Sequence, residues 1–383
     1  MTNGDITHTE DFLQRFIDSG YYPSLAVAVV RDGDVVYQGA VGVENLKTRK
    51  PATFSTPYHV ASVTKAFTAS LAAVLHEQGV IDLDQPAVTY LPENVRISTS
   101  PELGATITLR QLASHTSGLP RGVAAEVQSI EGRYELEPRR LYDLLANVEL
   151  TSDPGAARAY SNLGFGLLGH ALERAADKPL DRLMKEMICD PLKLANTAIQ
   201  DDEKIQPATG YRSKSRGGVE TVHSLKERLA GSGGLVTSAE DLAKFLIAQM
   251  EPGVFSTAVL DQLHTETPLS DGSGSGGALG WRVRWLEKVG PILEKNGGRS
   301  NCSAWIGFSP QHNVAVAIVT NSGGPNVDPI GRKLLTQSIP VLEERLPVDS
   351  DVVKASPFTD VRFEEEQVVV VFNGQAYRWL EVD

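Results

Sequence analysis

The sequence predicts an α/β fold of the α+β kind, in which an antiparallel sheet flanked by helices carries an inserted all-helical domain. Runs rich in β-branched residues lie towards both ends, at 25–41 and 279–320. Between them, helical spacing prevails and such runs are few. We therefore expect one discontinuous sheet domain at 1–81 and 208–348, a helical domain at 82–207 and a C-terminal β-hairpin extension at 349–383.

The first elements are an amphipathic helix and a hairpin. Apolar residues recur at helical spacing within 9–17, and Gly20 ends that helix. The runs 25–30 and 35–41 flank a turn that contains Asp32 and Gly33, which is typical of a β-hairpin. These two strands open the predicted sheet.

Residues 58–75 form a short strand end, a turn and a largely apolar helix, which begins with Ser62 and Lys65. Residues three apart share one helix face, so the lysine amine can reach the serine hydroxyl. The run 66–75 carries almost no charge, which predicts a buried helix, where a lysine is costly unless it has partners or a task. Ser-x-x-Lys gives a serine a nearby base without a histidine. Taken alone, the pattern fits better an N-cap serine followed by a surface lysine.

The later elements complete the sheet and close the domain. Helices are expected at 108–113, 163–176 and 238–246, strands at 279–286, 303–308 and 314–320, and a closing helix at 328–346. Beyond them, 367–372 and 375–380 flank Asn373 and Gly374, which is a strong hairpin signal.

Two further patterns carry polar groups suited to a site. Tyr160 and Asn162 bring a hydroxyl and an amide to a predicted helix N-terminus, although a core tyrosine and an N-cap asparagine fit equally well. Lys295 opens the run Lys-Asn-Gly-Gly, which also fits a hairpin turn with a surface lysine.

Composition argues against several classes of protein. The chain has 383 residues and a formal net charge of −12 with no long basic run, which argues against a nucleic-acid partner. Cys189 and Cys302 stand far apart and no His-x-x-x-His pair occurs, so no metal and no other cofactor is expected. Neither a signal peptide nor an apolar run of ~18 residues is found, so we expect no membrane partner and a cytoplasmic protein. The Gly-x-Gly-x-x-Gly match at 164–169 lies inside a predicted helix, which argues against a dinucleotide site.

The three patterns occur in the order Ser-x-x-Lys, Tyr-x-Asn, Lys-x-Gly, and in this order the chain resembles the serine β-lactamase and penicillin-binding protein superfamily. The tyrosine of the second motif is similar to that of the class C branch, to which β-lactamase-related esterases of the family VIII carboxylesterase type belong. Phrases typical of the wider family also occur at 115–120, 280–283 and 306–310. The resemblance covers about residues 12–346 and implies a β-lactamase/transpeptidase-like fold.

The resemblance implies acyl transfer through an ester on Ser62, with Lys65 and Tyr160 as the other catalytic residues. Either a neutral Lys65 or an ionised Tyr160 would remove the serine proton. The sequence leaves this open, because burial and the ammonium group of Lys295 act on both pKa values.

The remaining implied residues support the substrate. Asn162 would hold the lysine and the substrate, and Lys295 and Gly297 would line the site. The backbone N–H groups of Ser62 and Gly298 would form the oxyanion hole, where glycine lets the strand approach the substrate closely.

Asn296 departs from the Lys-Thr-Gly pattern and removes a hydroxyl that would contact a substrate carboxylate. This departure argues against β-lactam binding and favours a carboxylesterase acting on small esters. A D-amino-acid peptidase or amidase, a β-lactamase, an acyltransferase and a non-catalytic binding protein stay open as alternatives. The expected partner is a small-molecule ester or amide, and the sequence leaves a homo-oligomer open.

Overall fold

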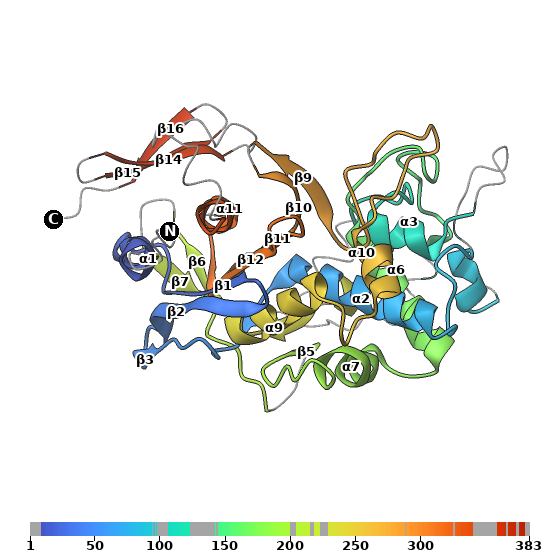
Figure 1. The fold of residues 1–383 in the computed structure, drawn as a ribbon, viewed down its shortest axis with the longest axis horizontal. Helices are drawn as coiled ribbons and strands as arrows, with labels where there is room; N and C mark the ends of the chain where they lie inside the picture. The colour runs from blue at the N-terminus through green and yellow to red at the C-terminus, as the bar shows by residue number, and fades with distance from the viewer. Residues whose placement is uncertain are drawn as a thin grey trace.

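The computed structural model describes residues 9–93, 95, 97, 106–122, 142, 145–199, 204–214, 218–222, 229–287, 289–324 and 326–339, and the backbone of 358–364, 367–372 and 375–379. Among these residues, seven antiparallel strands form the main sheet, in the order β3-β2-β1-β12-β11-β10-β9. Their bounds are β1 Ser24–Arg31, β2 Asp34–Asn45, β3 Lys50–Pro51, β9 Arg282–Leu286, β10 Gly290–Arg299, β11 Cys302–Ser309 and β12 Val314–Thr320. One sheet therefore unites strands from both ends of the main part of the chain, as predicted (Figure 1).

The central strands of this sheet carry large residues on one face and small residues on the other. Across the β1–β12 pair, Val27 lies opposite Ile318 and Ala28 lies opposite Ala317. Successive side chains of a strand point to opposite faces, so valine and isoleucine gather on one side and alanine on the other. The two faces belong to two separate apolar clusters.

Helices α1 (Thr9–Asp18) and α11 (Asp328–Gln337) cover the face with the large residues (Figure 1). Trp305 of β11 is fully buried under α11. A Cβ on Gly331 would lie 2.2 Å from a ring carbon of Trp305, so this glycine lets the helix lie directly on the indole. Phe16 and Leu13 of α1 complete the cluster.

Helix α9 (Ala239–Met250) covers the alanine-rich face, and α2 (Thr64–Glu77) packs beside it. The rings of Phe67 and Phe245 stack with centroids 3.8 Å apart and an interplanar angle of 11°. Every residue from Thr64 to Leu75 is buried, which confirms the prediction of a buried helix from its lack of charge. Helix α2 extends from the sheet into the helical region (Figure 1).

The described elements between β4 (Tyr58–His59) and β5 (Ala198–Ile199) are all helical. They are η2 Ala61–Val63, α2, η3 Ala87–Tyr90, α3 Leu109–Ser114, α6 Asn162–Ala176, α7 Leu180–Met184 and η4 Lys185–Cys189. Helices α8 (Ala230–Gly233) and α10 (Thr257–His264) follow later in the chain and pack against α2. The predicted domain boundaries at 81/82 and 207/208 stay a prediction.

Two small sheets and a C-terminal sheet complete the described structure. β4, β8 (Leu235–Thr237) and β5 form one of them, and β13 (Ser322–Gly323), β6 (Tyr211–Ser213) and β7 (Val219–Thr221) form another. At the C-terminus, β15 (Gln367–Phe372) and β16 (Gln375–Trp379) lie where the sequence predicts a hairpin, and β14 (Phe358–Glu364) adds a third strand to them.

The predicted fold class, an antiparallel sheet flanked by helices, is confirmed. The sequence predicts a strand at the Lys-x-Gly motif but not the full range of β10, because its proline and glycines interrupt the strand pattern. The closing helix begins at Asp328 as predicted, and residues 340–346 of that prediction lie outside the described residues. Within the described part of the chain, no helix has the length and apolar character needed to span a membrane. The cytoplasmic location stays a prediction.

Candidate active site

Ser62 lies in the short 3₁₀ turn η2, directly before α2, and it is half-buried. The preceding residue, Ala61, has a φ of 45°, a left-handed conformation that costs a residue with a side chain roughly 1–2 kcal/mol. Thr64 holds this turn from behind, because its hydroxyl donates to the Ala61 carbonyl at 2.6 Å and accepts from the Leu235 N–H at 3.0 Å. The backbone around the serine is therefore fixed by strand β8.

The Lys65 side chain is fully buried one turn further along. Its Nζ lies 2.5 Å from the Ser232 carbonyl oxygen, 2.8 Å from Asn162 Oδ1 and 3.2 Å from Ser62 Oγ. A neutral amine has two N–H donors and one lone pair. In the neutral amine the two shorter contacts take both N–H donors, so the lone pair would face the serine hydroxyl, whereas in the ammonium form the third N–H donates to Ser62 Oγ.

Burial and neighbouring cations both favour that neutral form. Burial lowers the pKa of Lys65 well below its ordinary value, and the positive charges of Lys295, Arg299 and Arg121 lower it further. Burial also lowers the pKa of Lys295, to about 7, and Arg158 adds to this. The site thus keeps an amine that can accept a proton near neutral pH.

Tyr160 and Asn162 approach the serine from the start of α6. Ser161 caps this helix by accepting a hydrogen bond from the Gly164 N–H at 2.9 Å. The Tyr160 hydroxyl lies 2.7 Å from Ser62 Oγ. Burial raises the pKa of Tyr160, although the hydrogen bond to Ser62 and the charges of two arginines oppose the shift. The phenol therefore stays protonated at neutral pH and can donate its hydrogen to the serine oxygen.

Three basic side chains surround the Tyr160 ring. Lys295 Nζ lies 4.9 Å from its centroid, Lys65 Nζ 5.0 Å and Arg121 Cζ 5.1 Å. Such contacts orient an aromatic ring by attraction between the cation and the ring face. They hold the phenol beside the nucleophile.

Strand β10 passes directly over the turn that carries the nucleophile. A Cβ on Gly297 would lie 2.0 Å from the Val60 carbonyl oxygen and 2.9 Å from the Ser62 nitrogen, so only glycine permits this approach. A Cβ on Gly298 would meet no atom within 4 Å and faces open space. Strand β9 pairs with β10 only as far as Glu294, so that the stretch containing Lys295 has β11 as its partner on one side.

Asn296 points to the other face of β10. Its amide nitrogen donates to Asp328 Oδ2 at 2.8 Å, at the start of α11. Asn296, which stands where the Lys-Thr-Gly pattern has threonine, is thus hydrogen-bonded to the carboxylate of Asp328.

The sequence identified the run 115–120 as typical of the family, but it did not identify His115 as a residue of the site. Its Nδ1 accepts a hydrogen bond from the Ser161 N–H at 3.1 Å, and its carbonyl accepts one from the Ala159 N–H at 2.8 Å. Its ring lies 4.5 Å from the Tyr160 ring, centroid to centroid. His115 therefore binds the backbone on both sides of Tyr160 and also contacts its ring.

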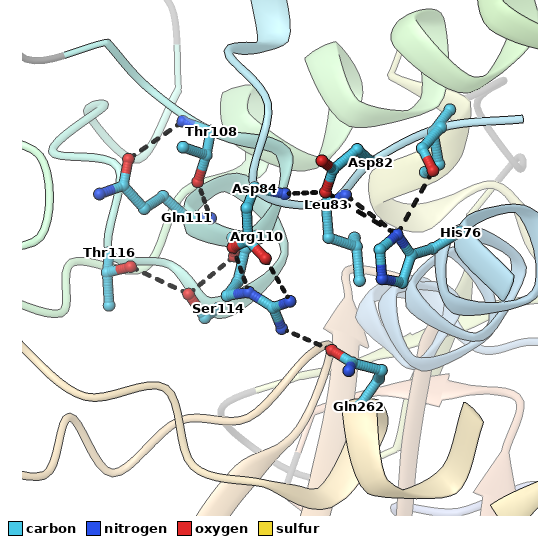
Figure 2. A network of polar contacts seen from close by, with 11 residues as sticks. His76, Asp82, Leu83, Asp84, Thr108, Arg110, Gln111, Ser114, Thr116 and Gln262 are labelled. Carbon is cyan, nitrogen blue, oxygen red and sulfur yellow. Dashed lines mark hydrogen bonds and ion pairs between the residues drawn. The ribbon is translucent and has the colours of Figure 1, made fainter. Parts of the chain in front are cut away.

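Figure 2 shows a polar network around helix α3, the helix that directly precedes His115 in the chain. Helix α3 begins with a capping box between Thr108 and Gln111. Arg110 binds both carboxylate oxygens of Asp84, at 2.6 and 2.9 Å, and Gln262 of α10 at 2.8 Å. The helix ends at His115 itself, whose φ is 65°. The hydrogen bonds and the ion pair of α3 therefore fix the position of His115.

The sequence also did not reveal the Ser232 carbonyl as a partner of Lys65, because a backbone acceptor has no sequence motif. Glycines bring its helix close: a Cβ on Gly231 would lie 2.9 Å from the Phe165 carbonyl oxygen and 3.3 Å from the Gly169 Cα. The Gly-x-Gly-x-x-Gly run lies inside α6, as predicted, and its last glycine serves this helix–helix contact.

The structure thus brings together Ser62, Lys65, Tyr160, Asn162 and Lys295 around one point, and Gly297 lies against the nucleophile's backbone. Among the residues that the structure describes, no group of three or more His, Cys, Asp or Glu could hold a metal ion.

Comparison with known proteins identifies one matching family and several related sequences and structures. A family model described as Beta-lactamase matches residues 9–339. The D-alanyl-D-alanine-carboxypeptidase/endopeptidase AmpH of Escherichia coli is 28% identical over 335 residues, which are 82% of this chain and 84% of AmpH.

Two solved structures show a similar fold. The octameric penicillin-binding protein homologue from Pyrococcus abyssi has a TM-score of 0.74 at 22% identity. The match covers 98% of this chain and 95% of the homologue's chain. EstCE1, described as a hydrolase with promiscuous acyltransferase activity, has a TM-score of 0.73 at 23% identity. The match covers 88% of this chain and 97% of the EstCE1 chain.

The glycine pair on β10 gives a first prediction. Gly297→Ala should destabilise the protein by about 1–3 kcal/mol and slow the labelling of Ser62 by a fluorophosphonate at least tenfold, because the added methyl collides with backbone. Gly298→Ala is the matched control for packing and should leave the free energy of unfolding unchanged, because a Cβ there meets no atom within 4 Å. Urea unfolding and mass spectrometry of the adduct measure the two effects. Equal behaviour of the two variants would contradict the close approach of β10.

The buried imidazole gives a second prediction. Burial, Lys295, Lys65 and Arg158 hold the pKa of His115 well below its ordinary value, so the folded protein binds fewer protons than the unfolded chain below pH ~6.5. Stability should therefore fall as the pH drops below that value, by at most about 1.4 kcal/mol per pH unit.

His115→Asn keeps a hydrogen-bond acceptor and tolerates the positive φ, but it does not titrate. Its free energy of unfolding, measured in urea between pH 7.5 and 5, should fall less steeply than that of the wild type. Parallel curves for the two proteins would rule out a buried neutral His115.

Proposed function

Because the chain belongs to the Beta-lactamase family of serine hydrolases, we propose that it forms an acyl-enzyme on Ser62 and hydrolyses small carboxylic esters. One observation carries the proposal. The Ser62 hydroxyl lies between the Lys65 amine, at 3.2 Å, and the Tyr160 phenol, at 2.7 Å. A hydroxyl placed between a base and a proton donor is the arrangement that nucleophilic catalysis needs.

In the proposed acylation, Ser62 Oγ attacks the substrate carbonyl while its proton passes to Lys65 Nζ. The raised pKa of Tyr160 and the lowered pKa of Lys65 favour the lysine over a tyrosinate as the base. The Ser232 carbonyl and Asn162 keep the lone pair of the amine directed at the serine.

The developing oxyanion would be bound by the backbone N–H groups of Ser62 and Gly298. Losing one such donor typically costs roughly 3 kcal/mol of barrier. Gly297 supports this assignment, because it brings β10 to within contact of the Ser62 backbone.

Collapse of the intermediate releases the alcohol, and Tyr160 would donate the proton that the leaving oxygen requires. Lys65 would then restore the proton to Tyr160. In deacylation the same pair would take a proton from water, which attacks the acyl-enzyme from the side of the departed alcohol.

The choice of an ester over a β-lactam rests on Asn296. Its amide is attached to Asp328 and offers no hydroxyl beside Lys295. EstCE1 is described as a hydrolase with acyltransferase activity, so transfer to an alcohol is included in the proposal. AmpH, the D-alanyl-D-alanine carboxypeptidase/endopeptidase, favours peptide hydrolysis as the second candidate function.

We also propose that the protein forms a homo-oligomer. The octameric homologue covers 98% of this chain, a share that extends into the C-terminal strands β14–β16. Exposed strand edges in such a sheet pair readily with another copy.

The third prediction tests the chemistry. Ser62→Ala should lower the hydrolysis of p-nitrophenyl butyrate to the rate of the buffer, because it removes the hydroxyl that forms the acyl-enzyme. Nitrocefin in parallel should be turned over much more slowly by the wild type. Ester turnover that survives in Ser62→Ala would overturn the proposal, and nitrocefin turnover as fast as that of the ester would replace the esterase by a β-lactamase or peptidase.

The fourth prediction concerns pH. Only neutral Lys65 can accept the proton, so kcat/KM should rise with pH along a limb that lies far below the ordinary lysine pKa of ~10.4. Arg121→Gln removes a cation that disfavours protonated Lys65, so the pKa of Lys65 should rise and the limb should move to higher pH. The exposed Arg182→Gln is the charge-matched control and should leave the limb in place. A limb that disappears in Tyr160→Phe would instead identify tyrosinate as the base.

A further inference from the structure

An exposed guanidinium group lies beside the ring of Tyr160. Arg121 Cζ is 5.1 Å from the ring centroid, and Arg121 is exposed, whereas Lys295 and Lys65 contact the same ring from buried positions. Among the ion pairs of the described residues, none includes Arg121. Its positive charge therefore acts on the phenol without a described carboxylate to neutralise it.

Hydrogen bonds hold the backbone of Arg121 next to the phenol. The Ser161 hydroxyl donates to the Pro120 carbonyl at 2.7 Å, and the Asn162 N–H donates to the Arg121 carbonyl at 2.8 Å. The two donors directly follow Tyr160 in the chain. Because both bonds are made by carbonyl groups of the main chain, a substitution of the Arg121 side chain leaves them in place.

Arg121 differs from the two lysines at this ring because its charge is permanent. A guanidinium group does not lose its proton in proteins, whereas an amine can. Burial lowers the pKa of Lys65 well below its ordinary value and lowers that of Lys295 to about 7. Of the three basic side chains at the ring, Arg121 is therefore the one that stays charged at every stage of the reaction.

The proposed reaction places a negative charge on this ring. When the tetrahedral intermediate collapses, the bond between the carbonyl carbon and the alcohol oxygen breaks, Tyr160 gives its proton to that oxygen, and the phenol becomes a phenolate. Burial opposes this charge and raises the pKa of Tyr160, whereas the hydrogen bond to Ser62 and the charges of Arg121 and Arg158 lower it. An acid with a lower pKa transfers its proton more readily.

We propose that Arg121 stabilises the phenolate that forms on Tyr160 as the alcohol leaves, and that it thereby makes the enzyme effective on esters of unactivated alcohols. The inference rests on the proposed function and narrows its substrate class. An activated alcohol such as p-nitrophenol leaves without a proton, so its ester gains little from this charge. An alkyl alcohol needs the proton, so its ester depends on the acid. Arg121 acts through Tyr160 and is therefore a positioning residue.

The kinetic test uses butyrate esters that share the acyl group and differ in the alcohol: p-nitrophenyl, phenyl, trifluoroethyl and ethyl butyrate. Each protein is assayed on the plateau of its pH profile, so that an altered pKa of Lys65 does not contribute. Arg121→Gln should lower kcat/KM about threefold to tenfold for the ethyl ester and less than about twofold for the p-nitrophenyl ester. The plot of log kcat/KM against the pKa of the alcohol should therefore become steeper.

Three further variants control this result. Arg121→Lys keeps a positive charge and should restore most of the rate with the ethyl ester. Arg182→Gln removes an exposed positive charge from α7 and should give the plot of the wild type. In a Tyr160→Phe background, Arg121→Gln should cause no further loss with the phenyl ester, because the acid through which it acts is absent. Circular dichroism melting verifies that each variant is folded.

A purely structural role of Arg121 predicts equal losses for all four esters. Parallel plots for the wild type and Arg121→Gln would therefore overturn the proposal. A further loss on adding Arg121→Gln to Tyr160→Phe would also overturn it.

A labelling test separates this inference from the proposed function. Phosphonate diesters react with Ser62 by a comparable displacement, in which the serine oxygen bonds to phosphorus and an alcohol leaves. If no carboxylic ester is hydrolysed, the esterase proposal falls, and mass spectrometry of the adduct decides the role of Arg121. A phosphonate that releases p-nitrophenol should label the wild type and Arg121→Gln at equal rates, and one that releases trifluoroethanol should label Arg121→Gln severalfold more slowly. Equal rates with both reagents would overturn the proposal.

Discussion

The buried amine of Lys65 is the constraint on which the rest of the structure depends. A lysine nitrogen without access to water needs partners, because an unpaired polar group in the interior costs several kcal/mol. The partners come from three separate segments: the Ser232 carbonyl from α8, the Asn162 amide from α6 and the Ser62 hydroxyl from the turn before α2. The helices must converge on this nitrogen, and the apolar run of α2 and the small residues between α6 and α8 allow them to do so.

Close backbone contacts give the site its precision. Strand β10 lies so near the Ser62 turn that position 297 cannot hold a side chain, and Ala61 is kept at a positive φ before the nucleophile. The positive φ of Ala61 stores some strain, which the hydrogen bonds between this turn and strand β8 balance. As a result, the direction of the nucleophile is fixed before the substrate binds. Groups positioned in advance in this way lower the activation barrier of the reaction.

Charge is distributed unevenly in this protein. The acidic surplus of the chain contrasts with a cluster of cations around Tyr160, and these cations act on the catalytic pKa values in one direction. They keep Lys65 neutral and draw negative charge towards the site.

The sequence by itself determined whatever depends on near neighbours. Ser62 and Lys65 share a helix face because of their spacing, the uncharged run of α2 is buried, and the runs that form β1, β2, β11 and β12 are strands. Local spacing also led to Tyr160, Asn162 and Lys295, which the fold brings to one point.

Only the tertiary structure decided the rest. The Ser232 carbonyl is a backbone group that every residue possesses, so no pattern reveals it. The ring contact of His115 with Tyr160 and the hydrogen bond of Asn296 to Asp328 join residues from distant segments. Such contacts depend on how helices and strands pack, and the physical reason they escape the sequence is that packing, unlike periodicity, is not encoded in the spacing of neighbouring residues.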